Sequence, residues 1–497
     1  MKEDFKYEIW NLPNYIFKLE NKEENLTEKD LKNVSGGIMN RKLTASILMG
    51  LSVLTASSNP LKANENTPLT AVTSQSEIQN QNVNFEITKN QAVEDINYVI
   101  KAIKDNHVSA VEKVPDEVTN QAKIEIENLK DKVSVIDEWR AISRIFSKLH
   151  DAHTMVLSPD FLNKRLPFDT EYENGKFICK SGDFKDCEIT AINDITIDEL
   201  YKIFQNHYSY EIEERTVHSF FETPSNFIPE GKFALCGIDT SKPIKVSFNT
   251  QSGVQSKNFE TTEIKTTEIK LLNLDSEQWV SYEIDEKNSL GIFKLNRCRY
   301  NEEYFNTLLN FYKEVSNKKI KNIAIDLRKN VGGNSAVVRL FALGLKKLEK
   351  FCSFGACVRD GNKILKRDSV VIDKNDIEEF RTYYLGENYD KNILFDGNVF
   401  LLTSHATFSS GLWFATIFSD NNLAKVVGEI PGNSPESFGD TSGKGFYAPN
   451  SKLKFCTTFK KFYRPDKTKD GTRLIPDVEV SAKDALSKVY ELIKNNK

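Results

Sequence analysis

Residues 320–347, IKNIAIDLRKNVGGNSAVVRLFALGLKK, decide the fold class of this chain. The apolar run from Ile320 to Leu327 has the length and composition of a buried strand. Gly332 and Gly333 then mark a tight turn, and the run from Ala336 to Lys347 has helical periodicity. A buried strand that leads through a turn into a helix is the repeating unit of a parallel α/β sheet.

The same alternation continues on both sides of this stretch. A strand is predicted at Leu290 to Leu295 and an amphipathic helix at Tyr304 to Val315. Further along, the apolar run from Val399 to Leu402 precedes a periodic run from Leu412 to Phe418. We therefore expect residues 276–497 to form an α/β core with a mostly parallel sheet.

Two serines, Ser409 and Ser410, stand between the predicted strand at Val399 to Leu402 and the helix that follows it. A hydroxyl at the positive end of a helix is well placed to act as a nucleophile and to have its oxyanion stabilised. The alternative is that both serines only cap the helix, because serine is a favoured N-cap residue. The N–H groups around Gly332 and Gly333 likewise suit an oxyanion hole or an ordinary turn.

Composition excludes several classes of function. The chain has 497 residues, 39% hydrophobic and 28% charged, which is typical of a soluble protein with two or three domains. A net charge of -4 gives no basic surface for nucleic acid. The seven cysteines form no Cys-x-x-Cys pair, and His150 and His153 have no third ligand nearby in sequence. We therefore expect neither a metal nor another cofactor.

Residues 1–38 end in Gly36-Gly37 after a polar, charged stretch. They resemble the double-glycine leader of bacteriocins and related peptides, which a transporter-linked peptidase removes. An ordinary helix with a glycine C-cap is the alternative interpretation.

Residues 39–63 have the layout of a secretory signal peptide: the basic Met39 to Lys42, the apolar Leu43 to Ala56, and a polar segment up to a cleavage point. Residues 64–87 are rich in Asn, Thr, Ser and Gln and are predicted to be a linker. These features predict a protein that is secreted or at the cell surface, which points to a bacterium and to its export machinery as a partner.

Two further units are expected between the linker and the core. Residues 88–158 contain three helical patterns and end at the histidine stretch from His150 to Thr154. Residues 159–275 consist of short β-type runs, and the hairpin pattern at Cys187 to Ile197 resembles PDZ-like domains. This β-rich segment is either a peptide-binding unit with an exposed strand edge or an ordinary mixed insert.

Several ordered motifs carry a family resemblance. The chain resembles the C-terminal processing (tail-specific) serine peptidases, and most closely their tricorn-core-like branch, over residues 90 to 485. This resemblance implies a ClpP/crotonase-like α/β catalytic core. The stretches that carry it are DLRKNVGGNS at 326–335, TFSS at 407–410, VGE at 427–429, APNS at 448–451 and IPDVEV at 475–480.

The resemblance implies that Ser409 attacks the peptide carbonyl. In the tail-specific branch the base is a lysine about 25 residues further on, but Ser434 stands there, and Lys444 is only a fallback. The tricorn-like branch takes a histidine from the preceding small domain, in an Asp-x-His context that Asp151 to His153 matches. His153 is therefore the expected general base.

The resemblance also implies an acidic residue about sixty positions after the nucleophile. Asp466 is the first choice for this orienting group and Asp470 the second. For the oxyanion hole we expect the backbone N–H of Ser410 and of Gly332 or Gly333.

The leading hypothesis is therefore a secreted serine endopeptidase that cleaves a polypeptide through an acyl-enzyme. Two alternatives remain at this point. The same fold serves as a non-catalytic carrier of hydrophobic ligands in retinoid-binding relatives, so this chain could instead bind a hydrophobic ligand or a peptide. The leader would suit a maturation or immunity factor for a secreted bacteriocin-like peptide. The sequence leaves the oligomeric state open.

Overall fold

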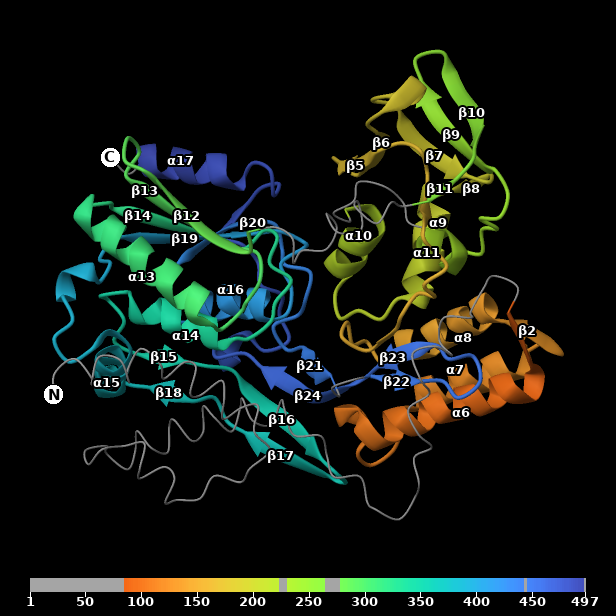
Figure 1. Cartoon of the computed structure of the whole chain (residues 1–497), viewed down its shortest axis with the longest axis horizontal. Coiled ribbons are helices and arrows are strands. Elements are labelled where there is room, and N and C mark those ends of the chain that lie inside the picture. Colours follow the sequence, from red (N-terminus) through yellow and green to blue (C-terminus); the bar gives the residue numbers. More distant parts are fainter. Residues whose placement is uncertain (1–84, 223–229, 264–277, 442–444, 496–497) are drawn as a thin grey trace.

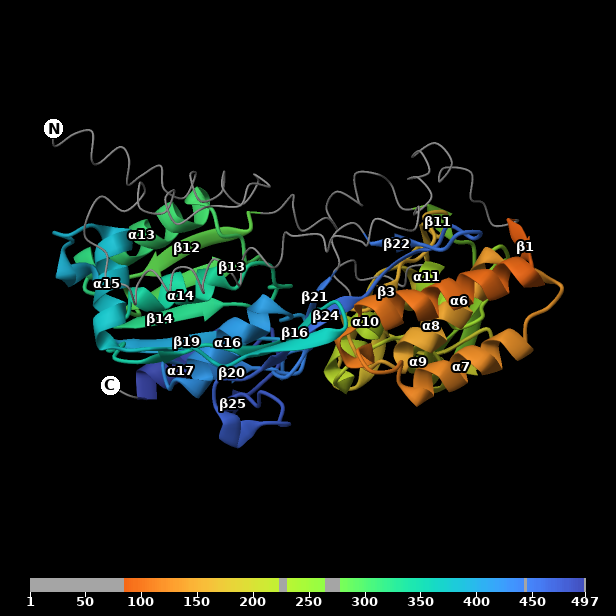
Figure 2. The ribbon, with the colours of Figure 1, turned by 90° about the horizontal axis from the view of Figure 1, so that it is seen from below.

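The computed structural model describes residues 85–222, 230–263, 278–441 and 445–495, which form two lobes side by side (Figures 1 and 2). The expected leader and signal peptide lie outside the described residues, as does nearly all of the linker.

The core lobe is built on a six-stranded sheet in the order β12-β13-β14-β19-β20-β25. Strand β12 is antiparallel to β13, and every other neighbouring pair is parallel. The mostly parallel α/β core expected from the sequence is confirmed. The strands are β12 (Val280–Asp285), β13 (Leu290–Leu295), β14 (Asn322–Asp326), β19 (Asn398–Thr403), β20 (Lys425–Gly428) and β25 (Val478–Glu479).

Helices cover both faces of this sheet (Figure 1). Helices α13 (Glu302–Asn317), α14 (Ala336–Leu343) and α16 (Ser410–Asp420) bury their apolar residues on one face, and α17 (Ala485–Asn495) packs on the other. Helix α14 is shorter than the sequence predicts. It ends at Leu343 because the backbone of the next residues pairs with Phe395 instead of continuing the helix.

The second lobe contains the three expected helices, α6 (Lys89–Asn106), α7 (Asp116–Glu127) and α8 (Val135–Ser147). They share one hydrophobic core with the β-rich segment, so the two units expected from composition pack as one body. The elements of that segment are β5 (Thr170–Glu173), β6 (Lys176–Cys179), β7 (Glu188–Ile192), β8 (Ile195–Thr196), β9 (Ile244–Thr250), β10 (Gly253–Phe259), α9 (Ile197–His207), α10 (Glu213–Phe221) and α11 (Glu230–Leu235).

Two small sheets join the lobes. One has the order β17-β16-β24-β21, and the other, β22-β23-β3, pairs the segment after His153 with a strand from the C-terminal part of the chain. These strands are β3 (Met155–Val156), β16 (Gly355–Asp360), β17 (Lys363–Arg367), β21 (Phe438–Thr441), β22 (Phe446–Tyr447), β23 (Lys454–Cys456) and β24 (Thr458–Tyr463). The chain therefore returns from the core lobe to hold the histidine segment in place.

The remaining elements are short or peripheral: β1 (Glu86–Thr88), β2 (Lys132–Ser134), β4 (Lys164–Arg165), β11 (Thr262–Glu263), β15 (Phe351–Cys352), β18 (Val371–Ile372) and α15 (Lys374–Leu385). No helix among the described residues has both the length and the apolar character needed to span a membrane.

Candidate active site

Ser409 lies at the junction of β19 and α16 in a strained backbone conformation, with φ 53° and ψ −126°. Residues with a side chain rarely adopt this region, and holding one there costs about 1–3 kcal/mol. The loop after β14 stabilises the turn. The hydroxyl of Thr407 donates to the carbonyl of Leu327 at 2.8 Å, and the N–H of Phe408 donates to the carbonyl of Asn330 at 2.9 Å. A strained turn of this type exposes the nucleophilic serine of many hydrolases.

The two glycines predicted at the β14 turn lie directly against Ser409. A Cβ atom on Gly332 would stand 2.6 Å from the Cβ atom of Ser409, and one on Gly333 would stand 2.3 Å from the carbonyl oxygen of Cys298. Both glycines also have positive φ values, 98° and 135°. Only glycine fits these positions, because both the contact and the backbone conformation exclude a side chain.

Two of the three N–H groups expected to form an oxyanion hole are free to do so. The N–H of Gly332 donates to the side-chain oxygen of Asn330 at 2.8 Å, so it is already used. Within the described part of the chain, no acceptor is recorded for the N–H of Gly333 or Ser410. The hydroxyl of Ser410 donates to the carbonyl of Gly333 at 2.7 Å, which ties these two donors together. The assignment of the oxyanion hole stays a prediction.

His153 lies beside the nucleophile turn. Its imidazole packs on the ring of Phe408, the residue before Ser409, with the ring centroids 4.6 Å apart. Both ring nitrogens are buried and have no hydrogen-bond partner among the described residues, although the residue as a whole is only half-buried. Burial lowers the pKa of His153 below its ordinary value, and the charge of Asp151 opposes this shift only in part. The imidazole is therefore neutral near pH 7 and able to take up a proton.

Asp151 fixes the segment that carries this histidine. Its fully buried carboxylate accepts hydrogen bonds from the hydroxyls of Thr154 and Thr458, at 2.6 and 2.7 Å, and lies 3.1 Å from Nε2 of His107. It also accepts the backbone N–H of His153 at 2.8 Å. Burial alone would raise the pKa of Asp151, but the hydrogen bond and charge of His107 bring it below its ordinary value. Both oxygens of Asp151 thus have hydrogen-bond partners, three at Oδ2 and one at Oδ1.

Asp466, the first choice for the third catalytic member, lies away from the imidazole. Its carboxylate accepts the N–H and the hydroxyl of Thr468, at 3.0 and 2.7 Å, and pairs with Lys469 at 3.4 Å. It caps the short helix η4 (Lys467–Lys469). Neither Asp466 nor Asp470 has a recorded contact with His153, so the structure does not bring the predicted third member to the base.

The alternative lysine base cannot be placed, because Lys444 lies outside the described residues. Ser434, at the position of the tail-specific lysine, follows a residue that supports the nucleophile turn. The side-chain oxygen of this residue, Asn433, accepts the backbone N–H of Ser409 at 3.1 Å.

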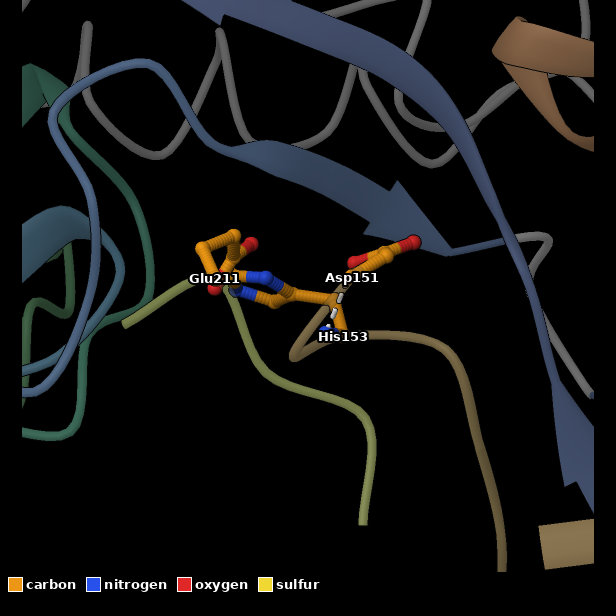
Figure 3. A group of neighbouring side chains, drawn as sticks. All are labelled: Asp151, His153 and Glu211. Carbon is orange, nitrogen blue, oxygen red and sulfur yellow. Dashed lines mark hydrogen bonds between the residues drawn. The ribbon is translucent and has the colours of Figure 1, made fainter. Parts of the chain in front are cut away.

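Glu211 is a residue of this site that the sequence did not indicate. It lies in the connection between α9 and α10. A carboxylate oxygen of Glu211, a carboxylate oxygen of Asp151 and a ring nitrogen of His153 all lie within 4.8 Å of one another (Figure 3). One oxygen accepts the side-chain N–H of Asn433 at 3.0 Å, and the other is buried with no hydrogen-bond partner in the described structure. Burial, together with the charge of Asp151, raises the pKa of Glu211 to about 8. No motif marks this residue, because the connection has no periodicity and lies nearly 200 positions from Ser409.

Neither group of acids and histidines near the site needs a metal to explain it. In the first group both oxygens of the Asp151 carboxylate already have hydrogen-bond donors, as described above. The second group is Glu222, His405 and Glu429. There Nδ1 of His405 lies 2.9 Å from the Glu222 carboxylate, and Glu429 accepts the backbone N–H of Ala482 at 2.8 Å. We assign no metal ligand to either group.

Comparison with protein families finds one match over the core lobe. Residues 289–480 match the model of peptidase family S41. This span contains the strained serine, both glycines and Asn433. No curated protein matches the chain.

Solved structures share the fold over most of the chain. A structure titled as mature CPAF complexed with lactacystin matches with a TM-score of 0.55 and 11% identity, covering 82% of this chain and 97% of its own. A second structure, of mature CPAF, matches with a TM-score of 0.54 and 11% identity, covering 82% and 96%. The photosystem II D1 C-terminal processing protease also matches, with a TM-score of 0.40, 12% identity, and 82% and 98% coverage.

The likeness to CPAF extends the common fold beyond the core lobe, because it covers 82% of this chain. The family match, which includes the strained turn at Ser409, gives the class of reaction and implies a polypeptide substrate. With residues 289–480 matching peptidase family S41, this chain is a serine-type peptidase.

Proposed function

We propose that the protein is an endopeptidase in which Ser409 is the nucleophile and His153 is the general base. The observation that supports this proposal most strongly is the strained backbone conformation of Ser409, with φ 53° and ψ −126°. A serine that only caps a helix has ordinary extended backbone angles and needs no such strain. Strain of this kind persists where the surrounding structure enforces it for function.

In the first step the neutral imidazole of His153 takes the hydroxyl proton of Ser409 while Oγ bonds to the carbonyl carbon of the peptide. The tetrahedral intermediate collapses when the carbon–nitrogen bond breaks and the imidazolium gives its proton to the leaving amine. An ester between Ser409 and the acyl part of the substrate remains.

In the second step water attacks the ester carbon and His153 accepts a proton from that water. The bond between the acyl carbon and Oγ then breaks, and the imidazolium returns its proton to Ser409. The products are one new amine and one new carboxyl terminus, and no cofactor enters the balance.

Negative charge on the former carbonyl oxygen is stabilised in both steps by the N–H groups of Ser410 and Gly333. Ser410 is the first residue of α16, so its N–H also lies at the positive end of the helix dipole. Loss of one such donor typically costs about 100–1,000-fold in turnover.

We further propose that the protein is secreted or held at the surface of a bacterial cell, as the signal-like residues 39–63 predict. N-terminal sequencing of the protein recovered from culture medium tests this. A new N-terminus near residue 64 supports export with cleavage, and recovery of the uncleaved chain from the cytosol alone contradicts it.

The catalytic proposal is tested by labelling with a serine-directed fluorophosphonate. The wild type is expected to be labelled, whereas Ser409→Ala and His153→Ala are not. Matched controls are Ser252→Ala, on the exposed turn between β9 and β10, and His150→Ala, whose ring is exposed. Labelling of Ser409→Ala at the wild-type rate, or no labelling of the wild type at any pH, contradicts the proposal.

A further inference from the structure

His153, the proposed base, has no hydrogen bond to Asp466 or Asp470, the two residues that the family resemblance suggested as its orienting partner. A catalytic imidazole works best when one nitrogen faces the nucleophile and the other donates to a fixed acceptor. Both ring nitrogens of His153 are buried and unbonded. Asp466 makes its hydrogen bonds with Thr468. In Asp151, Thr154, Thr458 and His107 contact Oδ2, and Oδ1 accepts the backbone N–H of His153, so both oxygens have a partner.

Glu211 is the one carboxylate beside the imidazole that still has a buried oxygen without a partner in the described structure. The imidazole of His153 extends toward it (Figure 3). The separation of up to 4.8 Å is longer than a hydrogen bond, but catalytic hydrogen bonds in free enzymes are often long and shorten when substrate binds.

Glu211 is also tied to the nucleophile turn. One carboxylate oxygen accepts the side-chain N–H of Asn433 at 3.0 Å. The oxygen of the same amide accepts the backbone N–H of Ser409 at 3.1 Å. This chain of two hydrogen bonds runs from the second lobe to the strained serine, so Glu211 is linked to Ser409 and also lies beside His153.

We propose that Glu211 positions His153, by accepting its second N–H through the unbonded carboxylate oxygen. The inference rests on the proposed function, since it assigns a partner to the base named there. Glu211 touches neither the scissile bond nor the proton in transfer, so it is a positioning residue.

The charged groups around the pair determine how this contact depends on pH. His153 faces Asp151, Asp440 and the guanidinium of Arg215, and Glu211 faces Asp151 and Arg215. Burial and Asp151 raise the pKa of Glu211 to about 8. Below that pH the carboxyl is mostly protonated and is a poor acceptor. Above it, the carboxylate accepts the N–H of His153 and stabilises the imidazolium of the transition state, so activity should rise through pH 8.

The test measures the second-order rate constant for fluorophosphonate labelling of the full chain between pH 5 and pH 10. This probe needs no knowledge of the natural substrate. We expect Glu211→Gln to label at least about tenfold more slowly at pH 9, within the range that positioned acid–base groups contribute. We also expect the rise near pH 8 to vanish in this variant. A role confined to stability would lower the amount of folded protein without removing that rise.

Three further variants make the result decisive. Glu211→Asp keeps the charge, so it should keep the rise near pH 8 at a reduced rate, and it serves if Glu211→Gln does not fold. Glu213→Gln, on the exposed start of α10, and Asp466→Asn should both behave as wild type.

Three outcomes would count against Glu211. Wild-type rates in Glu211→Gln at every pH overturn the inference and leave the proposed function standing. A defect in Asp466→Asn without one in Glu211→Gln has the same effect. No labelling of the wild type at any pH overturns the proposed function and the inference together.

Discussion

Gly332 lies against Ser409 so closely that no side chain fits between them. The serine is held in a strained conformation, and the absence of a side chain on the glycine leaves room for it. The hydrogen bond between the hydroxyl of Ser410 and Gly333 joins the same two turns a second time. The geometry of the candidate oxyanion hole therefore depends on the missing side chain of Gly332 and on the hydroxyl of Ser410.

Replacing Gly332 by alanine tests this dependence. The new Cβ would lie 2.6 Å from that of Ser409, at a φ of 98°. We expect the free energy of unfolding to fall by about 1–3 kcal/mol, as for other strained residues. We also expect labelling to slow by about 100-fold, the order of loss that a 1 Å misplacement causes. Chemical denaturation and labelling rates measure the two effects.

Gly361→Ala is the matched control, because Gly361 has a φ of 57° and a Cβ there would meet nothing within 4 Å. Gly361→Ala should lower the free energy of unfolding by no more than Gly332→Ala does, and it should leave the labelling rate unchanged. Wild-type labelling of Gly332→Ala would show that the contact with Ser409 is not required.

At this scale the sequence drew attention to some residues of the candidate site and not to others. Ser409 and the two glycines were identifiable, because they lie in short motifs between a strand and a helix. Glu211 and Asn433 were not, since each lies in a segment without periodicity. Their contact joins residues more than 200 positions apart, and only the packing of the two lobes brings them together.

Strand β24 is the element that holds the histidine segment. Its first residue, Thr458, donates a hydrogen bond to Asp151 at 2.7 Å, and Asp151 in turn accepts the N–H of His153. The preceding strand β23 pairs with β3, just after the histidine. A strand from the core lobe thus helps to hold His153, the proposed base, which belongs to the second lobe.

Thr458→Val should loosen this attachment, because it removes the hydroxyl and leaves a buried charged carboxylate with one donor fewer. The loss of a hydrogen bond to a charged group predicts a fall of about 1.5–3 kcal/mol in stability. Labelling should slow as well. Thermal unfolding and labelling rates measure the change, and Thr458→Ser, which keeps the hydroxyl, should stay near wild type. Equal behaviour of the two variants would contradict this role.

The periodicity of the sequence predicted the elements of the core sheet well and the strands that link the lobes poorly. Strands β13 and β14 and helices α13 and α16 were expected within a few residues of their bounds, because they are long apolar or amphipathic runs. Strands β21 to β24 were not foreseen as a link between lobes. Their pairing partners are distant in sequence, and the short runs carry no signal of what they pair with.

The two lobes meet beside the nucleophile turn through a charged contact. Glu222, which follows α10, lies 2.9 Å from Nδ1 of His405, four residues before Ser409. Burial would raise the pKa of Glu222, but hydrogen bonds and charges from His218 and His405 lower it to about 2. Burial would lower the pKa of His405, but Glu222 outweighs it and raises this pKa above its ordinary value.

Stability should follow these two shifts. The lowered pKa of Glu222 stabilises the fold fully above 4.5, its ordinary value, and this contribution is lost as the pH falls toward 2. The raised pKa of His405 stabilises the fold fully below 6.5, and this contribution is lost as the pH rises past the folded value. The contact is therefore strongest between pH 4.5 and 6.5.

Between pH 4.5 and 6.5, Glu222→Gln should lower the free energy of unfolding by about 1–3 kcal/mol, with a matching fall in the unfolding temperature. Above pH 6.5 both effects should be smaller. Melting curves of wild type and variant at each pH measure the difference. Glu112→Gln, at an exposed position, is the control. A difference that stays constant from pH 4 to pH 9 would contradict the coupling of these two groups.

At the scale of the whole molecule, the sequence indicated an α/β core, a helical unit and a β-rich unit, but not how the last two pack together. The α/β core was predictable, because its buried strands read as apolar runs. The helical and β-rich units were expected as separate parts from their change of pattern, yet their apolar faces form one shared core. Composition shows which residues are apolar but not which faces will meet.

The central claim, that Ser409 is the nucleophile, is tested most directly by locating the fluorophosphonate adduct. The wild-type protein is labelled, digested, and mapped by tandem mass spectrometry. We predict a single phosphonylated residue, Ser409, and no adduct in His153→Ala under the same conditions. An adduct on Ser410 or on any other residue, with Ser409 unmodified, would contradict the account.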